Sequence, residues 1–210
     1  MPDESAPANP MLVSTRNAHK VSEIRAILGP GFDVRDLSAL PAFPDVEETG
    51  STFEENATLK AVAASLHFDG WVIADDSGLE VDALGGAPGV RSARYAGPDT
   101  DDAANNALLL KNLAGLTGSQ RAARFRCVIV LARKGKKLAA FSGAVEGAIL
   151  TAPRGLAGFG YDPLFVADGS DATFAELGNE AKNAISHRSR ALAQLKLAEQ
   201  WREKRVDSSK

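Results

Sequence analysis

The sequence predicts a mixed-sheet protein of the α/β or α+β class. Three observations lead to this prediction. Strand-like and helix-like segments alternate in an irregular order, so neither an all-helical nor an all-strand fold fits. Residues 133–137, Arg-Lys-Gly-Lys-Lys, join two strand-like segments in the manner of a hairpin turn. The 210 residues are 44% hydrophobic, which is enough for the core of one domain or of two small lobes.

The first half of the chain contains clear helix signals. Apolar residues at helical spacing from Val21 to Leu28 predict a helix that Gly29 ends. Thr52 and Glu55 have the spacing of a capping box, which predicts the start of a second helix. The elements expected before residue 90 are strands at 11–14, 32–37 and 71–74, helices at about 20–28 and 52–67, a loop at 41–50, extended chain at 79–84 and a turn at 85–89.

In the second half, Leu108, Leu109 and Leu113 form the apolar stripe of a helix expected at 100–116. Strands are expected at 124–132 and 138–149, then a long loop that contains Gly155, Gly158 and Gly160, and a last helix from 186 to about 203. We expect residues 1–9 to form a mobile arm, 10–204 a single domain and 205–210 a tail.

The charge balance and the single cysteine exclude several classes of protein. With 24 Lys and Arg against 27 Asp and Glu, the net charge is −3, which is unsuited to coating nucleic acid. Cys127 has no partner for an internal disulfide, which fits a reducing cytosol. The longest apolar run, Cys127 to Ala132, is far shorter than the roughly 20 residues of a membrane helix. We therefore expect a cytoplasmic protein that binds neither nucleic acid nor a membrane.

Residues 14–20, Ser-Thr-Arg-Asn-Ala-His-Lys, connect the first strand to the first helix. Backbone N–H groups at a helix start attract anions, and Lys20 is expected one turn into the helix, near a bound phosphate. The alternative is an ordinary helix start that Thr15 or Asn17 caps. The segment is not a P-loop, because the glycine and lysine spacing of that motif is missing.

Asp75 and Asp76 directly follow the apolar strand at 71–74. Carboxylates are costly to bury there unless they bind a cation or hydrogen-bond donors. Magnesium fits, because it takes one or two carboxylates together with water and phosphate oxygens, and Glu47 or Glu48 could supply a second carboxylate. Neighbouring strand residues point to opposite faces, so only one aspartate can face a given cleft if the chain stays extended. The alternative is an Asp-Ser-Gly turn between two strands.

Two later segments offer groups that could contact a nucleobase. Residues 159–162, Phe-Gly-Tyr-Asp, combine a flexible glycine with aromatic faces suited to stacking. Lys182, His187 and Arg188 offer donors to phosphate or to carbonyl oxygens. The alternatives are aromatic side chains that fix a loop to the core and a solvated basic turn.

Seven motifs follow one another in a fixed order along the chain. They are Thr15-x-Asn17-x-x-Lys20, Glu47-Glu48-Thr49-Gly50, Phe53-x-x-Asn56-Ala57-x-x-Lys60, Ala74-Asp75-Asp76-Ser77-Gly78-Leu79, Gly85-Gly86-Ala87-Pro88-Gly89, Phe159-Gly160-Tyr161-Asp162-Pro163 and Ser186-His187-Arg188. This ordered set resembles the inosine triphosphate pyrophosphatase family over nearly the whole chain, from about Met11 to Glu199.

The resemblance implies an elongated two-lobed α/β fold around a long central mixed sheet, with an active-site cleft between the lobes, and a homodimer. It also implies magnesium-dependent hydrolysis of deaminated purine nucleoside triphosphates (dITP, ITP and XTP) to the monophosphate and pyrophosphate. That activity would remove mutagenic precursors from the nucleotide pool.

The resemblance further implies roles for individual residues. Asp76 would act as general base and would bind magnesium together with Glu47, whose motif position is favoured over that of Glu48. Many family members have glycine where this chain has Arg16, so either the approach of phosphate there must tolerate a side chain or Arg16 adds a cation. The implied substrate contacts are Ser14, Thr15, Arg16, Asn17, Ala18, His19, Lys20, Lys60, Ser77, Phe159, Gly160, Tyr161, Asp162, Lys182, His187 and Arg188.

Selectivity for the base would come from donors on His187 or Arg188 that meet the 6-oxygen of hypoxanthine or xanthine, since adenine has an amino group there. A further group would have to disfavour the 2-amino group of GTP. Two other functions compete with this hypothesis. One is a haloacid-dehalogenase-like phosphatase with Asp75 as nucleophile, although such enzymes normally have Asp-x-Asp and Ser77 occupies the third position. The other is a non-catalytic nucleotide sensor.

Overall fold

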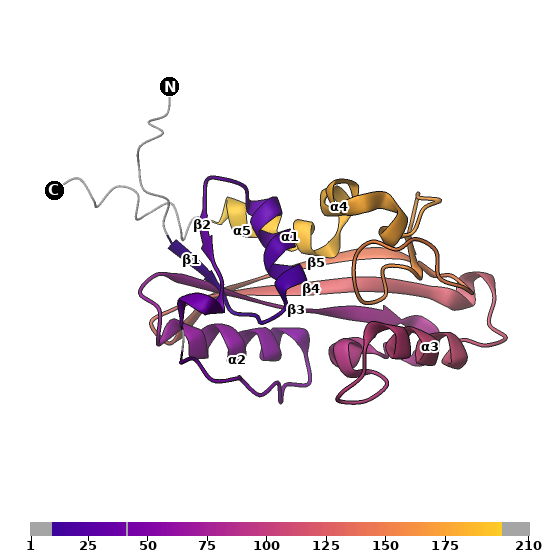
Figure 1. Cartoon of the computed structure of the whole chain (residues 1–210), viewed down its shortest axis with the longest axis horizontal. Coiled ribbons are helices and arrows are strands. Elements are labelled where there is room, and N and C mark those ends of the chain that lie inside the picture. Colours follow the sequence, from indigo (N-terminus) through magenta and orange to yellow (C-terminus); the bar gives the residue numbers. More distant parts are fainter. Residues whose placement is uncertain (1–9, 41, 199–210) are drawn as a thin grey trace, which may run out of the picture.

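The computed structural model describes residues 10–40 and 42–198, and it is built on one six-stranded mixed sheet with the strand order β2-β1-β3-β4-β5-β6 (Figure 1). β1 is parallel to both β2 and β3, and the other neighbouring pairs are antiparallel. This confirms the predicted mixed α/β class. The strands are β1 (Pro10–Val13), β2 (Asp33–Arg35), β3 (Trp71–Val81), β4 (Ala122–Arg133), β5 (Lys136–Ile149) and β6 (Phe165–Ala167).

Helices cover both faces of the sheet (Figure 1). On one face lie α1 (Ala18–Leu28), α4 (Phe174–Ile185) and α5 (His187–Leu197), and on the other lie α2 (Phe53–Ser65) and α3 (Asp102–Asn112). Within the two described ranges, no helix is both long and apolar enough to cross a membrane. The expected arm at 1–9, the tail at 205–210 and the end of the last helix lie outside the described residues.

The core follows the two-residue period of the long strands. Ile73 and Ile129 pack with α1 and α5 on one face, whereas Ala74 and Val130 pack with α2 on the other. A separate cluster fills the far end of the sheet, where Phe125 packs between strands and helices together with residues of α3, α4 and β6. Separate cores at the two ends agree with the expected two-lobed shape.

β3 is longer than the sequence suggested. It runs without interruption through Asp-Asp-Ser-Gly, because each residue from Val72 to Val81 pairs with β4. The alternative of a turn at this point is therefore wrong. Gly78 allows a close approach on one side, since a Cβ there would overlap the hydroxyl of Ser92, which accepts a hydrogen bond from Leu79 N at 2.9 Å. Residues 82–84, expected to be extended, form a turn of 3-10 helix instead.

Two elements near the C-terminus were not predicted, namely β6 and α4. α4 begins with a capping box between Thr173 and Glu176, a signal that the sequence does contain. Gly178 interrupts the helix with a φ of 74°, although Phe174, Leu177, Ala181 and Ile185 keep helical spacing across it. The helices expected at 52–67 and 100–116 are real but shorter, because α2 ends at Ser65 and α3 spans Asp102–Asn112.

Candidate active site

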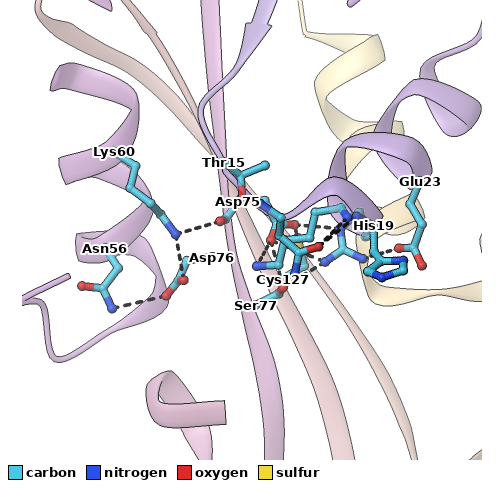
Figure 2. A network of polar contacts seen from close by, with 12 residues as sticks. Thr15, His19, Glu23, Asn56, Lys60, Asp75, Asp76, Ser77 and Cys127 are labelled. Carbon is cyan, nitrogen blue, oxygen red and sulfur yellow. Dashed lines mark hydrogen bonds and ion pairs between the residues drawn. The ribbon is translucent and has the colours of Figure 1, made fainter. Parts of the chain in front are cut away.

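The site is centred on β3, which presents Asp75 and Asp76 to opposite faces of the sheet (Figure 2). Asp75 shares its face with Ile73 and points toward α1 and α5, while Asp76 shares its face with Ala74 and points toward α2. The expectation that only one of the two carboxylates faces a given cleft is confirmed. The two aspartates therefore have different neighbours and different chemistry.

Asp76 is held by two side chains of α2. Lys60 Nζ lies 3.0 Å from its Oδ1, and Asn56 Nδ2 donates to its Oδ2 at 3.3 Å (Figure 2). Asn56 and Lys60 are four residues apart, so they occupy the same face of the helix. Lys60 also donates to the Asp75 carbonyl oxygen at 3.0 Å and to Glu48 Oε1 at 2.7 Å. A single ammonium group thus joins the strand to the acidic loop.

Burial raises the pKa of the Asp76 carboxyl above its ordinary value, although the neighbouring Lys60 and Lys20 lower it. Burial by itself would lower the pKa of Lys60, but Asp76 and Glu48 outweigh it and keep the pKa above the ordinary value. Lys60 is therefore a permanent cation between two carboxylates. A carboxyl whose pKa is raised by burial binds a proton or a cation more readily than an exposed one, and this suits Asp76 to both proposed roles.

The acidic loop places its two glutamates differently. Glu48 is half-buried and binds Arg94 Nη1 at 3.2 Å as well as Lys60. Glu47 is exposed and does not line the same cleft as Asp76. Asp76 together with one neighbouring glutamate is the small carboxylate set that magnesium accepts when phosphate and water complete its shell. The charge of Lys60 between the two acids shows that this position favours a cation.

Asp75 is fully buried and receives four side-chain donors. Lys20 Nζ lies 2.6 Å from Oδ1, Arg188 Nε donates to Oδ2 at 2.9 Å, Ser77 Oγ donates to Oδ1 at 2.8 Å, and Cys127 Sγ lies 3.0 Å from Oδ2. Burial opposes ionisation, but Arg188 and Lys20 outweigh it and hold the pKa of Asp75 well below its usual range. Asp75 is thus a permanent anion that fixes the side chains around it.

The junction between β1 and α1 combines a helix cap with cleft-lining groups. The Asn17 side chain caps α1, because its Oδ1 accepts from His19 N at 2.9 Å and from Lys20 N at 3.1 Å. The Ser14 hydroxyl donates to the Lys60 carbonyl oxygen at 3.1 Å, which joins this junction to α2. The segment is therefore both an ordinary capped start and part of the cleft.

Arg16 turns away from the helix start. Its guanidinium pairs with Asp45 and donates to the Phe43 carbonyl oxygen at 2.9 Å, and both partners lie in the loop that leads to the glutamates. The side chain is exposed, and it lines the outer part of the cleft. The Arg16 guanidinium is thus bound to the loop at 43–45.

The loop after β5 supplies the aromatic part of the site. The Phe159 ring stacks on His19, with ring centroids 5.4 Å apart and an interplanar angle of 16°. Lys182 Nζ lies 4.7 Å from the Phe159 centroid and 2.5 Å from Asp162 Oδ2. Asp162 also accepts from Phe159 N at 3.0 Å. The loop is therefore bound both to α1 and to α4.

α3 fixes the same loop from the other side. Asp102 accepts from Gly160 N at 2.6 Å, and Asn106 Nδ2 donates to the Gly160 carbonyl oxygen at 3.0 Å. The buried Tyr161 donates to the Ser92 carbonyl oxygen at 2.8 Å, so this residue does fix the loop to the core, as the alternative interpretation supposed. Phe159 is only half-buried and remains available to a ligand.

Lys182, His187 and Arg188 are buried, with exposed fractions of 2%, 4% and 1%, so the alternative of a solvated basic turn is wrong. The His187 ring stacks on Phe125 at a centroid distance of 4.9 Å. Burial, assisted by the charge of Arg188, holds the pKa of His187 well below its usual range, so the ring is neutral. Within the described part of the chain its Nδ1 has no hydrogen-bond partner. That nitrogen has almost no exposed surface, so the ring edge that a ligand can reach is the one that carries Nε2.

Two adjoining cavities gather the predicted residues. A charged cleft of about 330 Å³ is lined by Ser14, Thr15, Arg16, Asn17, Lys20, Glu48, Lys60, Asp76, Ser77 and Arg94, among others. An aromatic cavity of about 110 Å³ is lined by Asn17, Lys20, Ser77, Phe159, Gly160, Tyr161, Asp162, Lys182, His187 and Arg188, among others. The two share Asn17, Lys20, Ser77 and Ala93, so they form one continuous site. A shallow surface hollow of about 1210 Å³ next to the α2 N-terminus contains none of the predicted residues.

Three predicted residues, Ala18, His19 and Glu47, line neither cavity, although His19 touches Phe159. Four residues that the structure brings to the site were not among the predicted site residues, namely Glu23, Asn56, Asp75 and Arg94. Asp75 was considered only as a nucleophile, not as the carboxylate that holds Lys20 and Arg188. Asn56 carried a usable signal, since a polar residue four positions before Lys60 lies on the same helix face. The partners of Glu23 and Arg94 are too distant along the chain for any local pattern.

A family model described as the Ham1 family matches residues 11–198. The chain belongs to this family. It is 53% identical over 194 residues to a dITP/XTP pyrophosphatase of Geobacillus kaustophilus, which is 92% of this chain and 94% of that protein. It is 54% identical over 187 residues to a dITP/XTP pyrophosphatase of Geobacter sulfurreducens, and the match covers 89% of this chain and 94% of that protein. The predicted resemblance to the pyrophosphatases is confirmed.

Solved structures of Ham1 members have the same fold. The Ham1 protein of Staphylococcus aureus matches with a TM-score of 0.80 and 44% identity, over 90% of this chain and 96% of that chain. A nucleoside-triphosphatase / dITP/XTP pyrophosphatase of Mycobacterium abscessus matches with a TM-score of 0.72 and 44% identity, over 89% of this chain and 98% of that chain. The two-lobed mixed-sheet architecture is therefore that of the Ham1 family.

Proposed function

We propose that the protein hydrolyses deaminated purine nucleoside triphosphates (dITP, ITP and XTP) to the monophosphate and pyrophosphate. The observation that carries this proposal is the continuity of the aromatic cavity with the charged cleft. The aromatic cavity suits a base between Phe159 and neutral His187, and the cleft suits a triphosphate beside lysines and a buried carboxylate. The relatives named dITP/XTP pyrophosphatase support the same reaction.

In this mechanism, the side chains of the chain mainly position the reactants and neutralise charge. The helix start after Asn17 and the ammonium groups of Lys20 and Lys60 bind the triphosphate. Asp76 orients a water toward the α-phosphorus and accepts its proton, and the pyrophosphate unit leaves on the opposite side. Its raised pKa makes Asp76 a stronger base than an exposed aspartate.

Asp76 and Glu47 would hold magnesium, with Glu48 keeping Lys60 in place. When bound, the metal neutralises charge on the phosphate oxygens. Glu48 is already neutralised by two cations, Lys60 and Arg94, whereas the exposed Glu47 has no ion pair among the described residues. To bind the same metal as Asp76, Glu47 would have to turn toward the cleft from the loop at 42–50.

Base selectivity in this proposal depends on His187 rather than on Arg188. Arg188 already donates to Asp75, Ser77 and Glu23, so four of its five N–H groups are engaged within the protein. The neutral His187 ring can carry its proton on Nε2, on the ring edge that a ligand can reach, and donate it to the 6-oxygen of hypoxanthine or xanthine. Adenine would bring an amino donor to the same position and leave the ring N–H unpaired.

Neither competing function is favoured. A phosphatase with Asp75 as nucleophile would need an accessible carboxylate, but Asp75 is fully buried beneath Lys20 and Arg188. A non-catalytic sensor has no use for a buried carboxylate with a raised pKa beside the phosphate site. The homodimer and the cytoplasmic location remain part of the proposal, and sedimentation of the purified protein tests the first.

The decisive experiment incubates the protein with dITP, XTP, ATP and GTP, with and without magnesium, and assays pyrophosphate and orthophosphate separately. We expect magnesium-dependent pyrophosphate from dITP and XTP, with ATP and GTP nearly untouched. Orthophosphate as the first product would contradict attack at the α-phosphorus. Binding of dITP without either product would favour the sensor.

A further inference from the structure

Glu23 connects the two parts of the site without lining either cavity. It lies on α1, three residues after Lys20, and its exposed fraction is only 8%. Its Oε1 binds Lys182 Nζ at 2.8 Å, and its Oε2 binds Arg188 Nη1. These partners are 159 and 165 residues further along the chain. One carboxylate therefore sets the separation of two buried cations that both line the aromatic cavity.

The carboxylate completes a series of buried charges of alternating sign. Each neighbouring pair is in contact, in the order Lys20, Asp75, Arg188, Glu23, Lys182 and Asp162. The series contains three cations and three carboxylates, so its net charge is zero. It begins at the phosphate-binding helix and ends in the aromatic loop. Removal of Glu23 would leave Lys182 and Arg188 as adjacent buried cations with one carboxylate too few.

The position of Lys182 matters for the base, because its ammonium lies against the Phe159 ring as well as against Glu23. A shift of Lys182 would therefore alter the aromatic wall of the cavity. A shift of Arg188 would free donors that are now occupied and would move the adjoining His187. Both changes would alter the protein groups that contact the 6- and 2-positions of a bound purine. By contrast, Glu23 has no contact with Lys60 or Asp76 among the described residues.

We propose that Glu23 is a positioning residue for base selectivity, which holds Lys182 and Arg188 at a fixed separation so that the aromatic cavity discriminates between purines. The inference rests on the proposed function, because it concerns the same site and the same substrates. Glu23 itself touches no substrate.

The test compares Glu23→Gln with Glu23→Asp. Glutamine has the same shape, but its amide can accept from only one of the two cations and turns an N–H donor toward the other. Aspartate keeps the charge on a side chain that is shorter by one methylene group. Glu180→Gln is the matched control, because Glu180 lies exposed on α4, two residues before Lys182. All proteins are assayed with magnesium.

The primary readout is the ratio of kcat/KM for dITP to that for dGTP. We expect Glu23→Gln to lower this ratio by about tenfold or more, Glu23→Asp to lower it less, and Glu180→Gln to leave it unchanged. Inhibition by inorganic tripolyphosphate, which has no base, should change by less than about twofold in every variant. A general loss of structure would instead weaken tripolyphosphate binding and lower kcat/KM equally for dITP and dGTP.

An equal loss for dITP and dGTP in both Glu23 variants would overturn the inference. If Glu23→Gln does not fold, as judged by circular dichroism, the ratio measured for Glu23→Asp decides alone, and an unchanged ratio there contradicts the proposal. The unsubstituted protein separates the two hypotheses. If it fails to release pyrophosphate from dITP, the proposed function is refuted. The role of Glu23 would then be tested by the binding of IMP and GMP, where we expect Glu23→Gln to reduce the preference for IMP more than Glu23→Asp does.

Discussion

Asp75 and Asp76 are adjacent residues on β3 whose carboxyl groups lie on opposite faces of the sheet and have opposite pKa shifts. The first is enclosed by Lys20 and Arg188 and stays ionised, and the second faces the charged cleft, where burial favours its protonated form. The two-residue period of a strand thus separates a residue that fixes the structure from a residue that can accept a proton.

The two aspartates should respond differently to the same substitution. We expect Asp75→Asn to destabilise the fold by about 3–5 kcal/mol, because it leaves buried cations without their partner. Asp76→Asn should lower kcat roughly 100- to 10,000-fold while the protein still binds dITP. It should not lower the melting temperature, since it removes a carboxylate whose ionisation burial opposes. Urea unfolding and single-turnover kinetics measure both effects, and a destabilised but fully active Asp76→Asn would contradict the assignment.

His187 should make stability depend on pH. Its pKa is well below the usual value in the folded protein, whereas in the unfolded chain it is about 6.5. Below about pH 6.5 the unfolded chain therefore binds a proton that the folded protein does not, and stability falls as the pH falls. The loss is at most about 1.4 kcal/mol per pH unit, and stability from this group is constant above that pH.

Urea unfolding between about pH 5 and pH 8 measures this effect when the protein is compared with His187→Asn. The unfolding free energy is plotted against pH for each protein. The difference between the two slopes gives the contribution of His187, because both proteins retain the same carboxyl groups. Equal slopes would mean that His187 is not buried in its neutral form.

Gly143 should be needed for the position of α5. A Cβ at this residue would overlap the His187 carbonyl oxygen and lie 2.7 Å from Ala191 N, and neither backbone atom can yield without moving the helix. Gly143→Ala should therefore cost about 1–3 kcal/mol of stability and reduce activity by displacing His187 and Arg188. Gly31→Ala is the control, since nothing lies within 4 Å of its Cβ position. Activity that survives in Gly143→Ala would show that the helix start is not held by this contact.

The two glutamates of the acidic loop should differ in their magnesium dependence. Glu47→Gln should raise the magnesium concentration at half-maximal rate, because it removes a proposed metal ligand. Glu48→Gln should instead lower the rate at saturating magnesium, because it weakens the contact that holds Lys60 against Asp76. Magnesium titrations at saturating dITP separate the two. The reverse pattern would make Glu48 the ligand.

Local sequence patterns were sufficient for much of the fold. The apolar period of β3 and β4, the hairpin between β4 and β5, and the capping box of α2 were all predictable, because each depends on residues close in sequence. α4 was missed because a glycine within a segment argues against a helix, although the apolar residues on both sides of Gly178 keep helical spacing. The chemistry of 14–20, of Asp76 and of the aromatic loop was predicted from residue types and from the family resemblance. The pairing of Glu23 was not, since no local pattern encodes contacts more than 150 residues apart.

That separation has a consequence for biosynthesis. Glu23 and Asp75 leave the ribosome long before Lys182 and Arg188 are made, and at typical elongation rates the wait is roughly 10 to 30 seconds. Until then the carboxylates of Glu23 and Asp75 must remain hydrated, because Lys182 and Arg188, which pair with them in the interior, have not yet been made. Nascent chains that end before α5 should therefore be sensitive to protease. Completion of the site therefore waits until α5 has been made, and a ribosome that stalls before this helix leaves a chain with most of its sheet and an incomplete site.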